Sequence, residues 1–428
     1  MKRCLPQILL AVLVLTIVAI ITVTPIGIGS PYKVMERLGL YLADGGSGFV
    51  PKILAGNLVP KFENLHEALI SAMRWNGQFH LMGLGTVYGI ILCVALVLIS
   101  FFGSSDNYKA TNWVLAGMLF FAFADLAYME YFNSLYVIPL VMTLFLLCVG
   151  VRVSMFREAT VVRVIAFAVL SALLMITGST TGVIMGIALA VSMIDIRKKL
   201  PVILAVLLLA FGVGSLLYAR ETNYDVNIYN SVFQGTTKYA SVTELGLSEE
   251  LDALKDVFYS DEIVEEHRLG ETFYSNISYW KILKFYATHP VAFFNEVGTA
   301  SFNGANIRVY GASNYPWGGE ARWFSLYSSI KLGLLPAGIS LIVLILVFVW
   351  ANIKFKRKNA CFSMVVLAGL SLALLIAPVI LYGRVELGSS LYGFNIATDC
   401  MIVVAVVGGI RVYADRDNEL REKYGVKQ

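Results

Sequence analysis

Charged residues are scarce in this 428-residue sequence. Asp, Glu, Lys and Arg make up only 14% of it, against about a quarter of a soluble globular chain. Hydrophobic residues make up 58%, and the mean hydropathy is +0.73. This composition excludes a soluble domain and predicts an all-α, polytopic membrane protein surrounded by a lipid bilayer. The net charge of +4 is too small to indicate nucleic-acid binding.

Motifs for metals and nucleotides are also missing. The five cysteines lie in or beside apolar segments, without the spacing of a zinc site or a disulfide framework. There is no Gly-x4-Gly-Lys-Ser/Thr loop, so ATP hydrolysis by this chain is not expected. Asp415-Arg416-Asp417 resembles a metal-binding DxD motif, but it lies in a charged tail and is interpreted as solvated. We therefore predict neither a metal nor a cofactor.

Long apolar runs predict about ten membrane-spanning helices. The first follows Met1-Lys2-Arg3 and has no small-residue cleavage site, so it is interpreted as an uncleaved span. The fifth and sixth are separated by residues 177–182, interpreted as a tight turn between two short spans; one long bent segment is the alternative. The predicted spans cover approximately residues 5–27, 80–102, 112–130, 133–154, 164–179, 181–195, 201–219, 333–353, 361–382 and 394–413.

The placement of basic residues predicts the orientation. With ten spans, more than half of the 33 Lys and Arg residues fall in short segments on one side. Short basic loops are typical of the cytoplasmic side. Both termini are therefore predicted to be cytoplasmic.

This topology divides the chain into three parts. Residues 1–219 form a membrane module of seven spans with a long outer loop at 27–78. Residues 220–327 form a polar outer cap, and residues 328–428 add three spans and a cytoplasmic tail. Hydrophobic periodicity and capping residues predict further short helices at 62–75, 248–259, 278–286 and 291–300.

The segment from Asp125 to Tyr136 concentrates polar residues at the end of a span. Carboxylates at membrane depth are costly, and they usually face a wet, protein-lined cavity that marks a site. The alternative is helix packing, because Tyr and Asn also anchor helices at the interface and join them to one another. The candidate site residues here are Asp125, Tyr128, Tyr131, Asn133 and Tyr136.

The order of several motifs resembles the GT-C type membrane glycosyltransferases, and within them the bacterial glycan biosynthesis hexose transferase group. The likeness rests on four stretches, of which the 125–136 segment is one; the motifs at 229–233, 244–247 and 285–290 together make up another. The other three are Pro31-Tyr32-Lys33-Val34-Met35-Glu36-Arg37-Leu38-Gly39-Leu40, then Tyr229-Asn230-Ser231-Val232-Phe233 with Glu244-Leu245-Gly246-Leu247 and Phe285-Tyr286-Ala287-Thr288-His289-Pro290, and finally Gly383-Arg384-Val385-Glu386-Leu387 continuing through Leu391-Tyr392-Gly393-Phe394-Asn395 to Asp399.

The resemblance implies transfer of a hexose from a polyprenyl-phosphate donor to a glycan acceptor, at the outer face of a bacterial cytoplasmic (inner) membrane. That chemistry needs a carboxylate as general base and cations for the leaving phosphate. Glu36 and Asp125 are the candidate bases, and Arg37 and Arg384 the candidate phosphate ligands. Glu386 and Asp399 are candidates to orient the acceptor or to pair with an arginine.

The sequence also departs from that family's pattern. Gly27 and Ser30 occupy positions where the family has aspartates, and Ile138 occupies that of a further acid. A lysine is missing from the turn at 178–181, and a basic pair is replaced by Gly388-Ser389-Ser390. Two alternatives to an active enzyme therefore remain. One is a non-catalytic relative that binds lipid-linked glycan or scaffolds a partner membrane glycosyltransferase, and the other is a polysaccharide polymerase, flippase or transporter.

Overall fold

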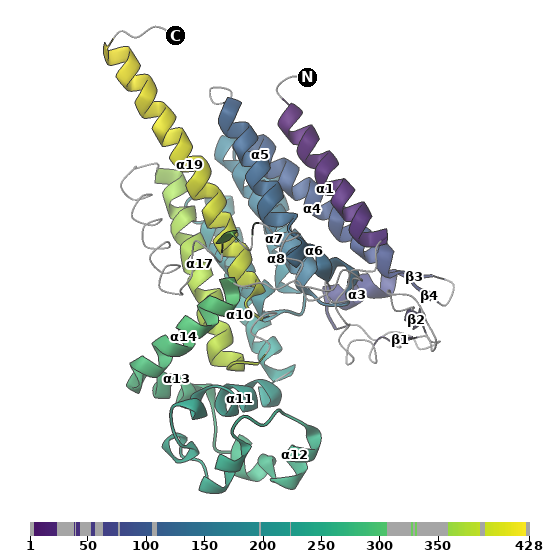
Figure 1. Ribbon diagram of the computed structural model, residues 1–428, viewed down its shortest axis with the longest axis vertical. Helices are drawn as coiled ribbons and strands as arrows, with labels where there is room; N and C mark the ends of the chain where they lie inside the picture. The colour runs from purple at the N-terminus through teal and green to yellow at the C-terminus, as the bar shows by residue number, and fades with distance from the viewer. Residues whose placement is uncertain are drawn as a thin grey trace.

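A computed structural model of the chain describes residues 4–23, 38, 40–42, 53–55, 63–75, 78–104, 109–196, 198–222, 224–305, 327, 330–331, 358–385 and 390–424. Long helices in these ranges run side by side as a bundle, and a group of shorter helices covers one end of it (Figure 1). The first helix begins, and the last helix ends, at the opposite end of the bundle (Figure 1). The predicted all-α polytopic architecture is confirmed at this level.

Six of the described helices are long and apolar enough to cross a membrane. Each is an apolar stretch that satisfies its own backbone hydrogen bonds, as a lipid environment requires. A seventh candidate is a pair of helices bent by 49° at a short break. The six are α1 (Leu5–Val23), α4 (Leu81–Gly103), α7 (Ile138–Arg157), α10 (Lys199–Thr222), α17 (Lys358–Tyr382) and α19 (Tyr392–Tyr424), and the pair is α5 (Lys109–Phe123) with α6 (Leu126–Met129) and the 3-10 helix η1 (Glu130–Asn133).

The other three predicted spans are not established. Two correspond to α8 (Val161–Met175) and α9 (Thr180–Ser192), which are apolar but shorter than a full span. They are separate helices joined by a turn in which Gly178 has a φ of +83°, a conformation that favours glycine. The remaining prediction, at 333–353, lies outside the described residues.

Helix α7 lies at the centre of the bundle. Of its apolar stretch 72% is buried, whereas α10 is only 22% buried and therefore offers most of its surface to lipid. Helices α4 and α7 pack along each other, and α1 packs on the far side of α4. A Cβ atom at Gly89 of α4 would lie 2.2 Å from a Val18 methyl of α1, so a glycine is needed for this close approach.

Two arginines of α7 join helices at the end of the bundle away from the cap. Arg152 donates from Nη2 to Asp195 Oδ1 (2.8 Å) and to Ser363 Oγ (2.9 Å), which ties α7 to α9 and α17. Arg157 donates from Nε to the carbonyl of Phe102 at 3.1 Å and so caps the last turn of α4. Both belong to the basic residues that predicted this side to be cytoplasmic.

The cap is defined here as residues 224–305, which follow α10. Its short helices run in different directions, and they meet the bundle at the ends of α10, α17 and α19 (Figure 1). Its elements are α11 (Tyr224–Phe233), η2 (Thr236–Lys238), η3 (Val242–Leu245), η4 (Glu249–Leu254), α12 (Asp261–Glu266), the π-helix η5 (Gly270–Tyr274), α13 (Tyr279–Thr288) and α14 (Pro290–Ala305).

Two predicted cap helices are confirmed and one is corrected. The predictions at 278–286 and 291–300 correspond to α13 and α14, which both extend further. The short helix predicted at 248–259 is wrong in its extent, because the structure forms only the 3-10 helix η4 there, at Glu249–Leu254. The chain becomes extended after η4, and Asp256 adopts a positive φ of 61°, which ends any helix.

The described residues of the loop between α1 and α4 form a short helix and a small sheet. Helix α3 (Leu65–Ala72) is shorter than the helix predicted at 62–75, because its C-terminal neighbours form strands instead. The Asn64 side chain caps it by accepting a hydrogen bond from the Glu67 N–H at 2.9 Å. The sheet has the antiparallel order β1-β2-β4-β3, with β1 (Leu40–Leu42), β2 (Ile53–Ala55), β3 (Arg74–Trp75) and β4 (Gln78–Phe79).

Substitution of Gly89 is expected to loosen the contact between α1 and α4. Gly89→Ala should lower the free energy of unfolding by about 1–3 kcal/mol, because the new methyl group overlaps Val18. Gly117→Ala in α5 is the matched control, because nothing lies within 4 Å of its Cβ position. That change should be neutral or slightly stabilising. Thermal unfolding in detergent measures both, and equal midpoints for the two variants would contradict the packing argument.

Candidate functional site

The bend between α5 and α6 lies at the end of the bundle nearest the cap. The backbone of Asp125 is extended, which interrupts the helix, and its Oδ1 accepts a hydrogen bond from the Ala127 N–H at 2.9 Å. A short acidic side chain competes with the backbone in this way and so starts a new helix. The 49° bend therefore has its cause in Asp125 itself.

Two carboxylates are buried along this broken span. Asp125 is 5% exposed, and Glu130 is fully buried in η1. Both lie within electrostatic range of the hydroxyl group of Tyr392, at the start of α19. Acidic side chains at such depth are rare in membrane proteins and usually mark a pathway or a site.

Four tyrosines form a continuous row of edge-to-face contacts at the same level. The ring of Tyr392 lies 5.0 Å from that of Tyr128 and 5.2 Å from that of Tyr131. Tyr131 in turn lies 5.9 Å from Tyr136. Edge-to-face geometry is the favoured arrangement of aromatic pairs. The row joins α6 and η1 to α19 and forms a rigid wall.

Asp399 lies at the centre of a polar cluster inside the bundle. Its Oδ1 accepts from Lys331 Nζ at 2.9 Å and from the Tyr327 hydroxyl at 3.0 Å. Its Oδ2 accepts from the Tyr128 hydroxyl and, at 3.4 Å, from Asn395 Nδ2. The side chains of Asp399 and Lys331 are 0% and 2% exposed. The charges of Asp399 and Lys331 therefore balance each other inside the protein.

Asn133 has a packing role. It donates from Nδ2 to the carbonyl oxygen of Ile21 in the last turn of α1 at 2.5 Å. Its side chain also lies against Gly85 of α4, where an added Cβ would lie 3.1 Å from Asn133 Oδ1. Asn133 therefore fits the alternative interpretation of the 125–136 segment, in which its polar side chains join helices.

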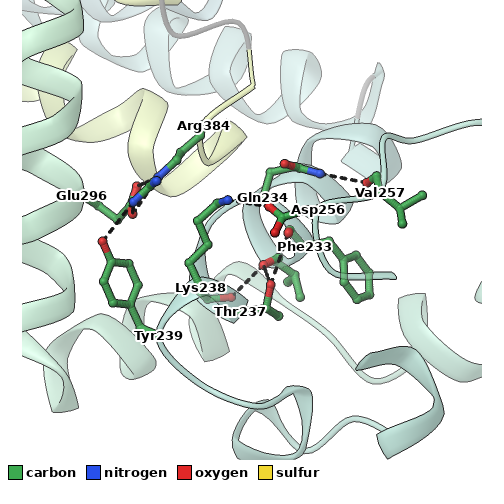
Figure 2. Close-up of polar contacts among 11 residues, drawn as sticks. Phe233, Gln234, Thr237, Lys238, Tyr239, Asp256, Val257, Glu296 and Arg384 are labelled. Atoms are coloured by element: carbon green, nitrogen blue, oxygen red, sulfur yellow. Dashed lines mark hydrogen bonds and ion pairs between the residues drawn. The ribbon is translucent and has the colours of Figure 1, made fainter. Parts of the chain in front are cut away.

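Arg384 connects the end of α17 to the cap (Figure 2). Its guanidinium binds the Glu296 carboxylate through Nε at 3.0 Å and Nη2 at 2.5 Å, and it donates to the Tyr239 hydroxyl at 3.2 Å. Hydrogen bonds to Glu296 raise the pKa of Arg384 above its usual range. Burial is the main cause of a raised pKa at Tyr239. Arg384 thus stays charged and already has an anionic partner.

A second ion pair lies beside the first (Figure 2). Lys238 Nζ binds Asp256 Oδ1 at 2.5 Å at the exposed side of the cap. The hydrogen bond from Lys238 holds the pKa of Asp256 below its usual range. Backbone contacts complete this junction, because the Arg384 N–H donates to Gln234 O at 3.2 Å.

A cavity of about 460 Å³ opens where the cap meets the bundle. Two tyrosines of the aromatic row contribute to its wall, and α11 covers it from the cap side. Its size lies within the range of small-molecule pockets. It is lined by Tyr136, Val137, Ile138, Val141, Ser179, Thr181, Val226, Asn227, Asn230, Phe258, Tyr259, Tyr382, Val385, Ser390, Tyr392 and Gly393.

Within the part of the chain that the structure describes, no three His, Cys, Asp or Glu side chains gather closely enough to hold a metal ion. The buried carboxylates of the broken span and of α19 lie on different helices. The chemistry available here is that of carboxylates, phenols and amides.

Comparison with known proteins identifies the family. A family model described as the YfdI N-terminal transmembrane domain matches residues 1–427. The chain belongs to this family. No curated protein and no solved structure matches the chain.

Membership of the YfdI family is consistent with a polytopic membrane protein. It assigns no role to individual residues, so those roles stay predictions. The structure brings Asp125, Tyr128, Tyr131 and Asp399 together around Tyr392. Tyr136 is joined to them through Tyr131, whereas Asn133 binds α1 and Arg384 lies in the junction with the cap. Glu36, Arg37, Glu386, Gly27 and Ser30 lie outside the described residues.

Several neighbours of the site were not predicted from the sequence. Asn395 lies four residues before the predicted site residue Asp399 on α19, so their shared helix face was a detectable signal. Lys331 is a lone cation next to an apolar run, which also indicates a buried partner. Glu296 and Asn230 gave no such signal, because their partners are distant in the sequence.

Removal of one member of the buried ion pair is expected to destabilise this YfdI-type domain strongly. Asp399→Asn leaves the Lys331 ammonium buried without a carboxylate, and should lower the free energy of unfolding by about 3–5 kcal/mol. The double variant Asp399→Leu with Lys331→Met removes both charges and should regain most of that loss. Thermal unfolding in detergent compares the two. A double variant as unstable as Asp399→Asn would show that charge pairing is not the cause.

Proposed function

We propose that this chain is a membrane glycosyltransferase of cell-surface glycan biosynthesis. It transfers a hexose from a polyprenyl-phosphate donor to a glycan acceptor at the cap side of the membrane. One observation carries the proposal: a span broken at Asp125 holds two buried carboxylates behind the tyrosine wall of a cavity at the cap junction. Irregular backbone and buried acids at membrane depth are found where a protein handles a polar substrate.

The proposed reaction is a displacement at the anomeric carbon. A carboxylate, from Asp125 or Glu36, takes the proton of an acceptor hydroxyl, and that oxygen forms a bond to the anomeric carbon. The bond between the anomeric carbon and the phosphate oxygen breaks, and its electron pair leaves with the polyprenyl phosphate. Arg37 and Arg384 are the proposed phosphate ligands, Arg384 by exchanging Glu296 for the phosphate.

A non-catalytic role in binding lipid-linked glycan is the second candidate. Specific observations favour it: Asp399 and Arg384 both bind internal partners, and neutral Gly27 and Ser30 occupy positions where related transferases have aspartates. On this proposal the protein holds a lipid-linked sugar for a partner membrane glycosyltransferase. Binding without turnover by the purified protein would distinguish it from an active enzyme.

The proposal places the cap outside a bacterial cytoplasmic membrane and both termini inside. Cysteines introduced at Ala159, before α8, and at Glu262, in α12, should then react with an impermeant maleimide on opposite sides. In a background without Cys4 and Cys361, only the Glu262 variant should be labelled in intact cells, and both after permeabilisation. Labelling of the Ala159 variant in intact cells would reverse the proposed orientation.

Loss of the Asp125 carboxylate is expected to reduce transfer strongly without unfolding the protein. Asp125→Asn keeps an oxygen that caps α6 but removes the negative charge, so transfer should fall at least about 100-fold. Glu36→Gln tests the other candidate base. The assay measures label transferred from polyprenyl-phosphate hexose to a mixed glycan acceptor extract by purified protein.

Glu262→Gln is the matched control, because Glu262 is exposed in the first turn of α12, far along the chain from the bend. It should transfer as the unmodified protein does. Full transfer by both Asp125→Asn and Glu36→Gln would show that the base has been assigned wrongly. No transfer by the unmodified protein, with labelled lipid still bound, would favour the non-catalytic role.

A further inference from the structure

Among the described residues, no charged side chain belongs to the lining of the cavity at the cap junction. Its walls combine aromatic and aliphatic surfaces with hydroxyl and amide groups. A phosphate needs cations or several directed N–H groups, so this lining does not suit one. An uncharged, polyhydroxylated ring suits it, because it offers hydroxyl groups to the polar side chains and an apolar face to the tyrosines.

Two amides point to a hydrogen-bonded ligand. Asn227 and Asn230 are three residues apart on α11, so they lie on the same face of that helix. Asn230 is 7% exposed, and among the described residues its Oδ1 has no hydrogen-bond partner. A buried acceptor without a donor is destabilising, and a ligand hydroxyl would supply the missing bond.

The cavity walls outside α11 also suit an uncharged, polyhydroxylated ring. Tyr392 is fixed by the aromatic row, and Tyr382 is held by a hydrogen bond from its hydroxyl to Thr180 Oγ1 at 3.2 Å. Ser179 and Thr181 flank that position and add hydroxyl groups to the lining. Rigid aromatic faces and fixed polar groups discriminate ligands by orientation.

We propose that this cavity binds the uncharged hexosyl ring of a lipid-linked sugar, with Asn230 accepting a hydrogen bond from a ring hydroxyl. The phosphate lies outside the cavity, towards the end of α17 where Arg384 follows the lining residue Tyr382 by two positions. This inference rests on the proposed function in one respect, namely that the ligand is a lipid-linked sugar. It assigns the sugar-binding subsite, whereas the reaction concerns the carboxylates behind the tyrosine wall.

The test compares the binding of three lipids that share the polyprenyl phosphate and differ only in the sugar. Purified protein in nanodiscs is titrated with polyprenyl-phosphate glucose, polyprenyl-phosphate mannose and bare polyprenyl phosphate of the same chain length. We expect at least one hexose form to bind about tenfold more tightly than the bare phosphate. Asn230→Leu should remove most of this difference, because one hydrogen bond to a buried acceptor accounts for about that factor.

Two further variants control for folding. Asn227→Trp starts from a half-buried position and fills the cavity, so it should also abolish the preference for the sugar while bare phosphate binds as before. Asn295→Leu changes an exposed asparagine of α14 and should keep the full preference. All variants are first checked for an unchanged unfolding midpoint.

The results separate the subsite from the reaction. A preference for the sugar that survives both Asn230→Leu and Asn227→Trp overturns the inference, as does equal binding of all three lipids by the unmodified protein. Equal binding with all lipids weakened by Asn227→Trp would mean that the cavity holds the polyprenyl chain instead. If the protein binds a hexose lipid more tightly than the bare phosphate but transfers no sugar, only the proposed catalysis is contradicted. If it transfers sugar but binds the lipids equally, only the proposed subsite is contradicted.

Discussion

The carboxylate of Asp399 is the interaction on which the cap-facing half of the bundle depends. It accepts hydrogen bonds from an ammonium, two phenols and an amide, and its own side chain is 0% exposed. A lone carboxylate there would be severely destabilising, so the helices that supply its partners must stay together. Tyr128 is one of these partners, and it carries the constraint into α6 and the tyrosine row.

The break at Asp125 has a different physical origin and serves the same region. The Asp125 side chain marks the end of one helix and caps the next, and the two helices are bent by 49° relative to each other. The short helices after the break bring Glu130 and Tyr131 under α19. Because residues of both the broken span and α19 hold the tyrosine row, the cavity that this row lines keeps a defined shape.

The cap closes this cavity because it is bonded to the end of a membrane helix. Carbonyl groups in the last turn of α17 lack partners within the helix, and Ser231 Oγ donates to one of them, that of Ile380, at 2.5 Å. Gly383 has a φ of +61°, and a Cβ there would lie 2.6 Å from the Asn230 carbonyl oxygen. The Arg384–Glu296 pair then fixes α14 against the same point. The subsite and its cover therefore form one packed unit.

The sequence by itself determined the membrane class, most of the spans and the helices α13 and α14. These follow from local properties: apolar runs of membrane length, capping residues and the placement of basic residues. It also pointed to Asp125 and Asp399, because charges in apolar runs are conspicuous. It failed at 248–259, where a short local pattern was overridden by the extended chain and the positive φ of Asp256.

Only the tertiary structure decided which of these residues meet. Lys331 and Asp399 are 68 positions apart, and Arg384 and Glu296 are 88 apart, so no local spacing could reveal either pair. The cavity likewise draws its lining from several helices and from segments between them. Burial and pairing in three dimensions distinguish a carboxylate that is neutralised, such as Asp399, from one that lies behind a cavity wall, and a linear sequence does not contain that distinction.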